Sequence, residues 1–226
     1  MPHVAHIAMS GFRVREREML ALGMTLPGLR PRAEALAGLP SLGLLTIAAL
    51  TPEHWTQSYH EAAAVNDGLI AEILATRPTV AAISALTASV LDAYALAARL
   101  RAEGVRVVIG GLHATVCPGE AAAQADAVVV GDGEPVWAEL LADAQAGTLR
   151  PRYQADRAFD LACSPLPRYD LLGARERPRF TLQTERGCPL ACEFCGPSRV
   201  LGPFREKPVE RIHAELDALR TLARRP

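Results

Sequence analysis

Val105-Arg106-Val107-Val108-Ile109-Gly110-Gly111 has the pattern of a buried strand that ends in a tight glycine turn. A similar run follows at Ala127–Val130, and Gly131-Asp132-Gly133 comes directly after it. Apolar periodicity predicts helices at Ser89–Glu103 and Glu134–Ala146, each closed by a glycine. Apolar strands that alternate with helices through short links indicate a parallel sheet covered on both faces. The sequence therefore predicts an α/β domain with a Rossmann- or flavodoxin-like, doubly wound sheet.

The remaining elements extend this pattern towards both ends of the chain. Further strands are predicted at Val4–Met9, His54–His60, Val80–Leu86 and Phe180–Thr184, and further helices at Ser41–Leu50, from Asn66 to Pro78, at Gly119–Ala125, and from Pro208 onward. The helix at Ser89–Glu103 is expected to turn Val90, Leu91, Tyr94, Ala97, Ala98 and Leu100 inward. These elements predict a first domain over residues 1–147, a linker rich in arginine and proline over 148–178, and the start of a second domain over 179–226.

Composition narrows the class of protein. The chain has 226 residues, of which 50% are hydrophobic, and its 24 basic and 25 acidic residues give a net charge of −1. Such a balance offers no basic field for nucleic acid, and no apolar run is long enough to cross a membrane. An odd number of cysteines, five, argues against a disulfide framework. With no secretion signal evident, we expect a cytoplasmic protein.

Three cysteines fall within eight residues near the end of the chain. Cys188, Cys192 and Cys195 have the spacing Cys-x3-Cys-x2-Cys, and Phe194 stands directly before the third. Thiolates this close on an irregular loop suit iron or zinc better than disulfides. Three sulfurs can hold three irons of a 4Fe–4S cluster and leave the fourth iron without a protein ligand. The alternative is a structural zinc site completed by His213 or Cys163, although zinc loops usually come as two Cys-x2-Cys pairs.

The cysteine loop, preceded by Arg186-Gly187, resembles the signature of the radical S-adenosylmethionine (SAM) enzymes. The resemblance implies that Cys188, Cys192 and Cys195 bind a 4Fe–4S cluster whose free iron chelates SAM. It also implies that an electron from the cluster cleaves SAM to methionine and a 5′-deoxyadenosyl radical. Phe194 is then expected to shield the cluster from water, and a flavodoxin or ferredoxin to act as reductant.

The first domain carries a second resemblance. Gly110-Gly111-Leu112-His113-Ala114-Thr115, the run Ala125–Glu134 and the linker motif Pro165–Leu172 resemble the cobalamin-binding domain of cobalamin-dependent radical SAM enzymes, and the order of parts also matches. Ligands of doubly wound sheets bind beyond the carboxyl ends of the strands. The resemblance implies that the groove for the nucleotide tail and corrin edge is lined by Ser84, Thr87, Gly110, Gly111, Gly131 and Gly133, with His113 and Glu134 as further candidate contacts.

One departure from the cobalamin pattern concerns the cobalt ligand. Many cobalamin proteins have an Asp-x-His-x-x-Gly loop that supplies a histidine to cobalt, but Ser10-Gly11-Phe12-Arg13 stands after the first strand here. We therefore expect cobalamin to bind without a histidine from that loop. Outside these motifs, Cys117 and Cys163 are expected to be bystanders, and Arg199, Arg205 and Glu206 to be solvated.

The length of the second domain bears on function. The resemblance implies that the second domain is a TIM-type radical SAM barrel. A full eight-unit barrel takes roughly 250 residues, whereas residues 179–226 provide only the first βα unit of a partial barrel, with one strand, the cysteine loop and one helix. We therefore expect a fragment of a cobalamin-dependent radical SAM enzyme, whose last helix exposes Val209, Ile212, Leu216 and Leu219. Methyl transfer to carbon in a small-molecule substrate is one expected outcome, and rearrangement or cyclisation are others. The alternative is a non-catalytic cobalamin- or ligand-binding module with a metal-stabilised tail.

Overall fold

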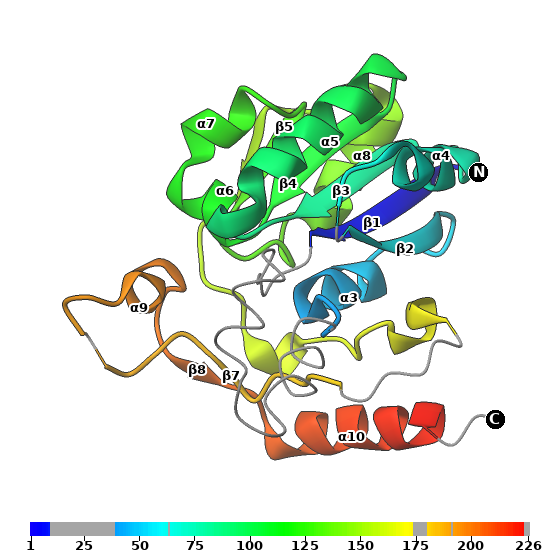
Figure 1. Cartoon of the computed structure of the whole chain (residues 1–226). Helices are drawn as coiled ribbons and strands as arrows, with labels where there is room; N and C mark the ends of the chain where they lie inside the picture. The colour runs from blue at the N-terminus through cyan, green and yellow to red at the C-terminus, as the bar shows by residue number, and fades with distance from the viewer. Residues whose placement is uncertain (10–38, 63, 174–179, 191, 224–226) are drawn as a thin grey trace, which may run out of the picture.

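The protein folds around one six-stranded parallel sheet, which confirms the predicted fold class (Figure 1). The computed structural model describes residues 1–9, 39–62, 64–173, 180–190 and 192–223. The strand order is β2-β1-β3-β4-β5-β6. The strands span His3–Met9 (β1), Thr56–Ala62 (β2), Val80–Ser84 (β3), Arg106–Gly110 (β4), Ala127–Val130 (β5) and Arg152–Gln154 (β6). The sequence did not predict β6, which pairs with β5 and extends the sheet into the segment interpreted as a linker.

Helices cover both faces of the sheet. They span Leu42–Ala49 (α3), Asp67–Ala75 (α4), Val90–Ala102 (α5), Leu112–Val116 (α6), Pro118–Ala122 (α7) and Trp137–Ala146 (α8), and short 3₁₀ turns span Thr87–Ser89 (η1), Leu161–Cys163 (η2) and Tyr169–Leu172 (η3). Residues of α4, α5, α6 and α7 pack on one face, and residues of α3 and α8 pack on the other. The Asn66 side chain caps α4 by accepting a hydrogen bond from the Leu69 N–H, and Gly147 ends α8 in the left-handed region, whereas the Ser41 side chain makes no capping hydrogen bond to α3.

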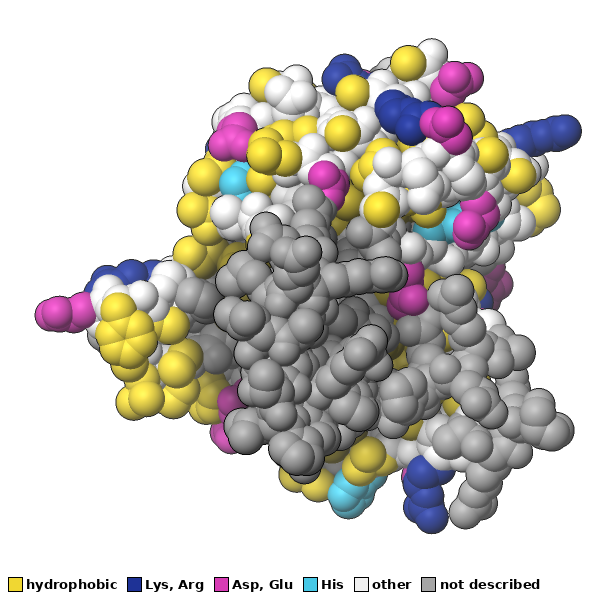
Figure 2. Space-filling view, viewed as in Figure 1, with side chains coloured by type: hydrophobic (Ala, Val, Ile, Leu, Met, Phe, Trp, Pro, Cys, Tyr) yellow, Lys and Arg dark blue, Asp and Glu magenta, His cyan; other side chains and the backbone are white. Residues whose placement is uncertain are grey.

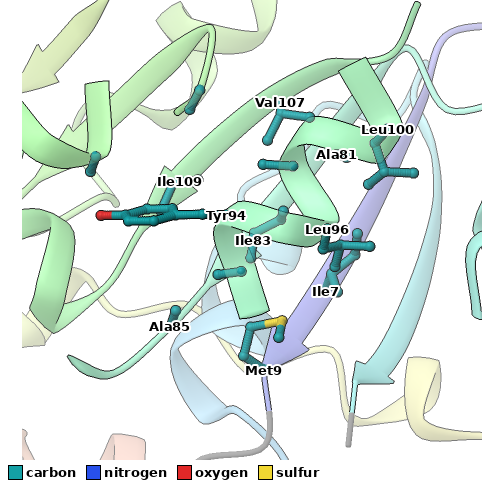
Figure 3. Packing of buried hydrophobic residues seen from close by; sticks show 14 of the residues in the cluster. Ile7, Met9, Ala81, Ile83, Ala85, Tyr94, Leu96, Leu100, Val107 and Ile109 are labelled. Carbon is teal, nitrogen blue, oxygen red and sulfur yellow. The ribbon is translucent and has the colours of Figure 1, made fainter. Parts of the chain in front are cut away.

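Alternation along each strand explains why nearly every residue of the central strands β3, β4 and β5 is apolar. In β4, Val107 and Ile109 face α5, whereas Val108 faces α8. The same division holds in β3, where Ile83 packs on the α5 side and Ala82 on the α8 side. Figure 3 shows the α5 side of this core. Because both faces are covered, a strand has no position for a solvated side chain in its middle.

The inward face of α5 differs from the prediction. Leu91 is 76% exposed and Ala98 is exposed as well, whereas Ala93 and Leu96 are fully buried. Buried positions therefore follow Val90 at helical spacing, and Leu91, which stands one residue out of phase, points to solvent. The predictions for Leu91 and Ala98 were wrong because they followed residue type instead of phase.

One buried histidine lies within the α8 side of the core. His6 on β1 is fully buried, and its ring lies 5.9 Å from that of Trp137. Its Nε2 is 3.0 Å from the Gln57 side-chain oxygen, so this nitrogen carries the proton. Burial lowers the pKa of His6 to about 4, against a smaller opposing effect of the Gln57 hydrogen bond. The imidazole is therefore neutral at pH 7.

The C-terminal segment forms a small separate unit below the sheet (Figure 1). Glu185–Arg186 (β7) pairs antiparallel with Arg205–Glu206 (β8), α9 spans Gly196–Val200 between them, and α10 spans Val209–Ala223. The strand predicted at Phe180–Thr184 is wrong, because strand pairing begins only at Glu185. No helix among the residues placed by the structure is both long and apolar enough to span a membrane.

Helix α10 is attached through its buried side. Leu219 and Leu222 pack against Leu45, Tyr169 and Leu172. Within the same segment, Lys207 next to β8 forms a buried ion pair with Glu215 on α10. Val209 and Leu216 are exposed as predicted, whereas the prediction that Leu219 is exposed was wrong, because η3 and α3 supply an apolar surface for it.

Candidate cofactor-binding site

A cavity of about 710 Å³ opens at the carboxyl ends of β3, β4 and β5. Six residues predicted from the sequence line it: Ser84, Gly110, Gly111, Gly131, Gly133 and Glu134. The opposite wall comes from the C-terminal segment, through Gln183, Arg186, Gly187, Leu201 and Arg205 among others. The cavity therefore lies between the sheet edge and the β7–β8 hairpin, where ligands of doubly wound folds bind.

The glycines of the cavity have different physical roles. At Gly111, where φ is +96°, an added Cβ would lie 3.0 Å from the Ala85 carbonyl oxygen, so this glycine is required by the close packing of two strand ends. At Gly131, where φ is +77°, no atom of the described residues lies within 4 Å of an added Cβ. Gly131 therefore presents bare backbone towards open space, which suits close approach by a ligand.

Thr115 fixes the two glycine loops relative to each other. Its hydroxyl donates to the Gly111 carbonyl oxygen at 2.9 Å and accepts from the Gly131 N–H at 3.0 Å. One hydroxyl thereby satisfies backbone groups of both loops, so these loops are held together by two hydrogen bonds as well as by packing.

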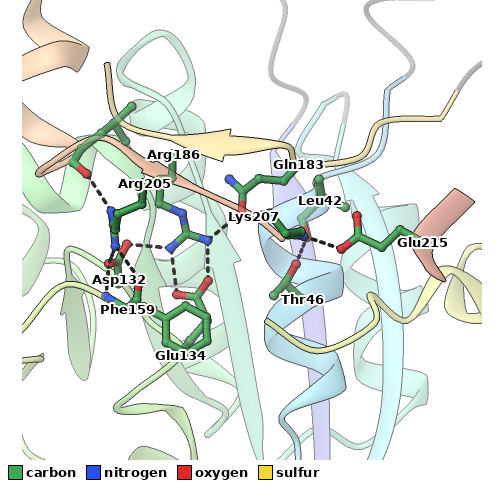
Figure 4. Close-up of polar contacts among 11 residues, drawn as sticks. Leu42, Thr46, Asp132, Glu134, Phe159, Gln183, Arg186, Arg205, Lys207 and Glu215 are labelled. Carbon is green, nitrogen blue, oxygen red and sulfur yellow. Dashed lines mark hydrogen bonds and ion pairs between the residues drawn. The ribbon is translucent and has the colours of Figure 1, made fainter. Parts of the chain in front are cut away.

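An ion-pair cluster joins the sheet edge to the cysteine segment (Figure 4). Two guanidinium nitrogens of Arg186 donate to the Glu134 carboxylate at 2.5 and 3.2 Å, and one also donates to Asp132 at 2.7 Å. Arg205 donates to the other Asp132 oxygen at 2.6 Å and to the Phe159 carbonyl oxygen at 2.8 Å. We call Asp132, Glu134, Arg186 and Arg205 the junction cluster.

Burial makes the junction cluster energetically significant. The Glu134 side chain is 5% exposed and that of Arg186 is 15% exposed. Burial opposes ionisation of Asp132, but hydrogen bonds from Arg205, the Phe159 N–H and Arg186 hold the pKa of its carboxyl below the ordinary value. Likewise, Glu134 and Asp132 raise the pKa of Arg186 although burial acts in the opposite direction. Asp132 and Arg186 are therefore charged at neutral pH, and removing one member of the cluster leaves a buried group without its partner.

The backbone directly after Arg186, at Gly187, leaves no room for a side chain. Its φ is +89°, and an added Cβ would lie 2.6 Å from the Pro203 carbonyl oxygen. The chain therefore passes directly against the segment that leads into β8 at this point. This contact sets the start of the cysteine loop, because Cys188 is the next residue.

The three clustered cysteines lie at the surface beyond the hairpin. All are free thiols; Cys188 is exposed, and Cys192 and Cys195 are half-buried. The Cys195 N–H donates to the Cys192 carbonyl oxygen at 3.1 Å, which closes a turn between them. Hydrogen bonds from the Ser198 N–H and hydroxyl lower the pKa of the Cys195 thiol. Hydrophobic side chains gather on this lobe (Figure 2), including Phe194, which is 92% exposed.

The donor set of this loop fits an iron–sulfur cluster. Within the ranges that the structure describes, the three loop cysteines do not bring their sulfurs to one metal ion, and a single group, His113, Cys117 and Glu120, gathers its ligand atoms within 4.8 Å. In a 4Fe–4S cluster, however, each thiolate binds a different iron, so its sulfurs need not meet at one point. Three free thiols on an exposed loop, with a turn between two of them, are compatible with that arrangement.

Three of the residues predicted to contact a cofactor do not line the cavity. Thr87 lies in η1, where its hydroxyl is 3.2 Å from Nδ1 of His113, and His113 is buried under α5. Phe194 points to solvent beyond the hairpin. The loop Ser10-Gly11-Phe12-Arg13, on which the expected absence of a cobalt-binding histidine depends, lies outside the described residues.

Sequence reasoning missed the junction cluster and Thr115. Arg205 was expected to be solvated, and this was wrong, because its side chain is 14% exposed and paired with Asp132. The available signal was the concentration of acids in Gly131-Asp132-Gly133-Glu134 together with an arginine directly before the glycine of the cysteine loop. Arg199 and Glu206 are exposed, as expected.

Comparison with known proteins agrees with this architecture. Residues 32–141 match the family model of the B12 binding domain. A bacteriochlorophyllide d C-8(2)-methyltransferase of Chlorobaculum tepidum is 36% identical over 120 residues, which cover 50% of this chain and 27% of the relative. An uncharacterized methyltransferase of Synechocystis sp. is 32% identical over 188 residues, covering 80% of this chain and 34% of the relative. A hopanoid C-2 methylase of Rhodopseudomonas palustris is 26% identical over 195 residues, covering 82% and 36%.

A solved structure shows the same fold. Apo OxsB, described as a cobalamin-dependent S-adenosylmethionine radical enzyme, superposes with a TM-score of 0.65 at 14% identity, over 98% of this chain and 32% of that chain. The fold, the cavity and the family match define a protein with a B12-binding domain. Residues 32–141 therefore form a B12-binding domain, as the resemblance predicted, and the curated relatives of the chain include these methyltransferases. The chain spans about a third or less of the length of each of the curated methyltransferases that it matches.

Proposed function

We propose that this chain supplies the cobalamin site and the cluster loop of a cobalamin-dependent radical SAM methyltransferase. The observation that carries the proposal is the cavity, because one wall comes from the glycine loops of the B12-binding domain and the other from the residues that lead into the cysteine loop. A cofactor held by the first domain would therefore lie beside the segment that carries Cys188, Cys192 and Cys195.

The cavity residues suit part of cobalamin. Sites of about 300–1,000 Å³ bury most of a drug-sized ligand. A cavity of about 710 Å³ therefore fits one part of this larger cofactor, and the rest of the cofactor would extend out of the cavity. Apolar walls from Ile47, Val129 and Trp137 suit a flat aromatic group. Open backbone at Gly131 and the hydroxyl of Ser84 offer hydrogen bonds to polar groups. In the proposed enzyme, bound cobalamin would supply a transferable methyl group, and the cluster with SAM would supply a radical able to activate a C–H bond.

The residues around the cofactors would act by position. Arg186 and Glu134 hold the start of the cysteine loop against the sheet edge. Gly187 has no side chain, which lets the backbone pass close to Pro203. Cys188, Cys192 and Cys195 would bind iron as thiolates, and the hydrogen bonds of Ser198 favour the charged form of Cys195. A small-molecule substrate and a reductant such as flavodoxin or ferredoxin are part of the same proposal.

Cobalamin binding is tested by filling the cavity without disturbing the fold. Gly43 lies in α3 and lines the cavity, and among the residues that the structure describes no atom lies within 4 Å of an added Cβ. Gly43→Leu should weaken hydroxocobalamin binding by about tenfold or more and should raise helix stability by about 0.5–1 kcal/mol. The matched control is Gly119→Leu in α7, which has equally open space but does not line the cavity. Equal affinity of both variants and the unchanged chain would contradict the proposed site.

The cluster is tested separately. Anaerobic reconstitution of the full chain should yield about four irons and four sulfides per chain, and Cys188→Ala, Cys192→Ala and Cys195→Ala together should abolish this uptake. Cys163→Ala is the control, because Cys163 is an exposed cysteine outside the loop. Zinc in place of iron by elemental analysis would favour the non-catalytic module, as would iron uptake that persists in the triple variant.

A further inference from the structure

His113, Cys117 and Glu120 form a cluster that the proposed function does not use. His113 and Cys117 are separated by one turn of α6, so both lie on one face, and Glu120 follows in the first turn of α7. One ligand atom of each residue lies within 4.8 Å of the others. The side chains are an imidazole, a thiol and a carboxylate, which together are the ligand types of zinc sites.

The imidazole is positioned as a ligand would be. His113 is 6% exposed, and its Nδ1 lies 3.2 Å from the Thr87 hydroxyl. Among the residues that the structure describes, its Nε2 has no hydrogen-bond partner, although a Glu120 oxygen lies 3.4 Å away. If Nδ1–H donates to Thr87, Nε2 presents its lone pair to Cys117 and Glu120. Metal-binding histidines are commonly oriented by such a bond on the other nitrogen.

A second buried polar group faces the same point. The Tyr94 hydroxyl on α5 is buried and lacks a well-formed hydrogen bond within the described ranges. Burial, followed by the nearby Glu120 carboxylate, raises the pKa of Tyr94 to about 12. Two buried polar groups from different elements, the Tyr94 hydroxyl and the His113 imidazole, therefore converge on the Glu120 carboxylate.

We propose that His113, Cys117 and Glu120 bind a divalent metal ion, with zinc as the best match to the ligand set. Zinc bonds of about 2.0–2.3 Å place the ligand atoms of a tetrahedral site about 3.5 Å apart, so the group must close by about 1 Å. Glu120 is exposed and Cys117 half-buried, so their side chains have room to move, whereas buried His113 is already fixed. On binding, the Cys117 thiol loses its proton to solvent, and water occupies the fourth position.

Such an ion would connect three elements. Cys117 stands between α6 and α7, and His113 contacts η1 through Thr87, so the ion would tie both short helices to the start of α5. The cluster does not line the cavity, so this site is distinct from the proposed cobalamin and iron–sulfur sites.

The test uses Co²⁺ and Zn²⁺ on the full chain with Cys188, Cys192 and Cys195 all changed to Ala, so that the loop thiols cannot compete. We expect one equivalent of Co²⁺ to give a thiolate charge-transfer band. Cys117→Ser should abolish the band and weaken Zn²⁺ binding by about 100-fold, and Glu120→Gln should weaken it by about tenfold, comparable to losses seen for partners of metal ligands. Cys163→Ser is the matched control and should change neither measurement.

A second measurement, alkylation of Cys117, needs no change at the proposed metal ligands and so does not depend on the stability of those variants. In the same background, Zn²⁺ should slow alkylation of Cys117 and leave alkylation of exposed Cys163 unchanged. Circular dichroism checks that Cys117→Ser and Glu120→Gln remain folded. The proposal is overturned if no Co²⁺ band forms, if the band survives Cys117→Ser, or if Zn²⁺ fails to protect Cys117.

Discussion

The edge of the parallel sheet and the cysteine loop face each other across the junction cluster, yet they are stabilised in different ways. The glycine loops continue buried strands such as β4 and β5, and Thr115 ties the two loops together. The cysteine loop, by contrast, exposes Leu190 and Phe194 and is held chiefly at its two ends. Under the proposed function, packing preforms the side that would bind cobalamin, whereas metal binding would order the other side.

Truncation of an apolar side chain should show the largest difference between the two regions in the free energy of unfolding that is lost. Leu96→Ala removes a fully buried side chain of α5 and should lower the free energy of unfolding by about 2–5 kcal/mol. Phe194→Ala removes a larger side chain but should change it by less than about 0.5 kcal/mol, because the ring is already in water. Urea unfolding followed by circular dichroism measures both, and a large loss for Phe194→Ala would show that the loop packs in solution.

The junction cluster should show the next largest effect. Arg186→Met leaves the buried Glu134 carboxylate without its partner and should lower the free energy of unfolding by about 3 kcal/mol. Arg199→Met is the matched control, because Arg199 is exposed on α9, and it should have almost no effect. The double variant Arg186→Met with Glu134→Leu should recover much of the loss. Equal effects of Arg186→Met and Arg199→Met would contradict the structural role assigned to the cluster.

Acid should weaken the sheet before it weakens the junction. The folded pKa of His6 is about 4 against 6.5 when unfolded, so the unfolded state takes up the proton first and stability falls between pH 6.5 and pH 4. At 1.36 kcal/mol per pKa unit, the loss reaches about 3 kcal/mol. The folded pKa of Asp132 is lowered instead, so its contribution is present above 3.8 and lost only at lower pH.

The corresponding measurement is the free energy of unfolding at pH 7 and pH 4. His6→Gln removes the titrating group and should reduce the difference between the two values by up to about 3 kcal/mol. His54→Gln, at an exposed histidine, should leave the difference unchanged. An identical pH dependence in the His6 variant would show that the buried imidazole does not control it.

The smallest expected effect concerns the start of the cysteine loop. Gly187→Ala places a Cβ against the Pro203 carbonyl oxygen and requires a positive φ at a residue with a side chain, so we expect a loss of about 1–2 kcal/mol. Gly196→Ala is the control, because an added Cβ there has no atom within 4 Å. The same urea titration measures both, and a neutral Gly187→Ala would indicate that the hairpin shifts easily.

The parts that the sequence predicted are those that depend on local pattern. Apolar runs such as Val105–Ile109 specify strands because both faces of the sheet are covered, and glycines after strands mark the cavity edge. β6 was missed because its three residues include two exposed polar side chains and therefore give no apolar run. The junction cluster was missed because Asp132 and Arg186 are 54 residues apart, and only the tertiary fold brings them together.

The junction cluster has a consequence for domain exchange. Asp132 and Glu134 belong to the first domain, and Arg186 and Arg205 to the segment with the cysteine loop. A chimera whose first domain lacked these two acids would bury two guanidinium groups without counter-charges. Domains recombined from different relatives must therefore carry matching charges at these four positions.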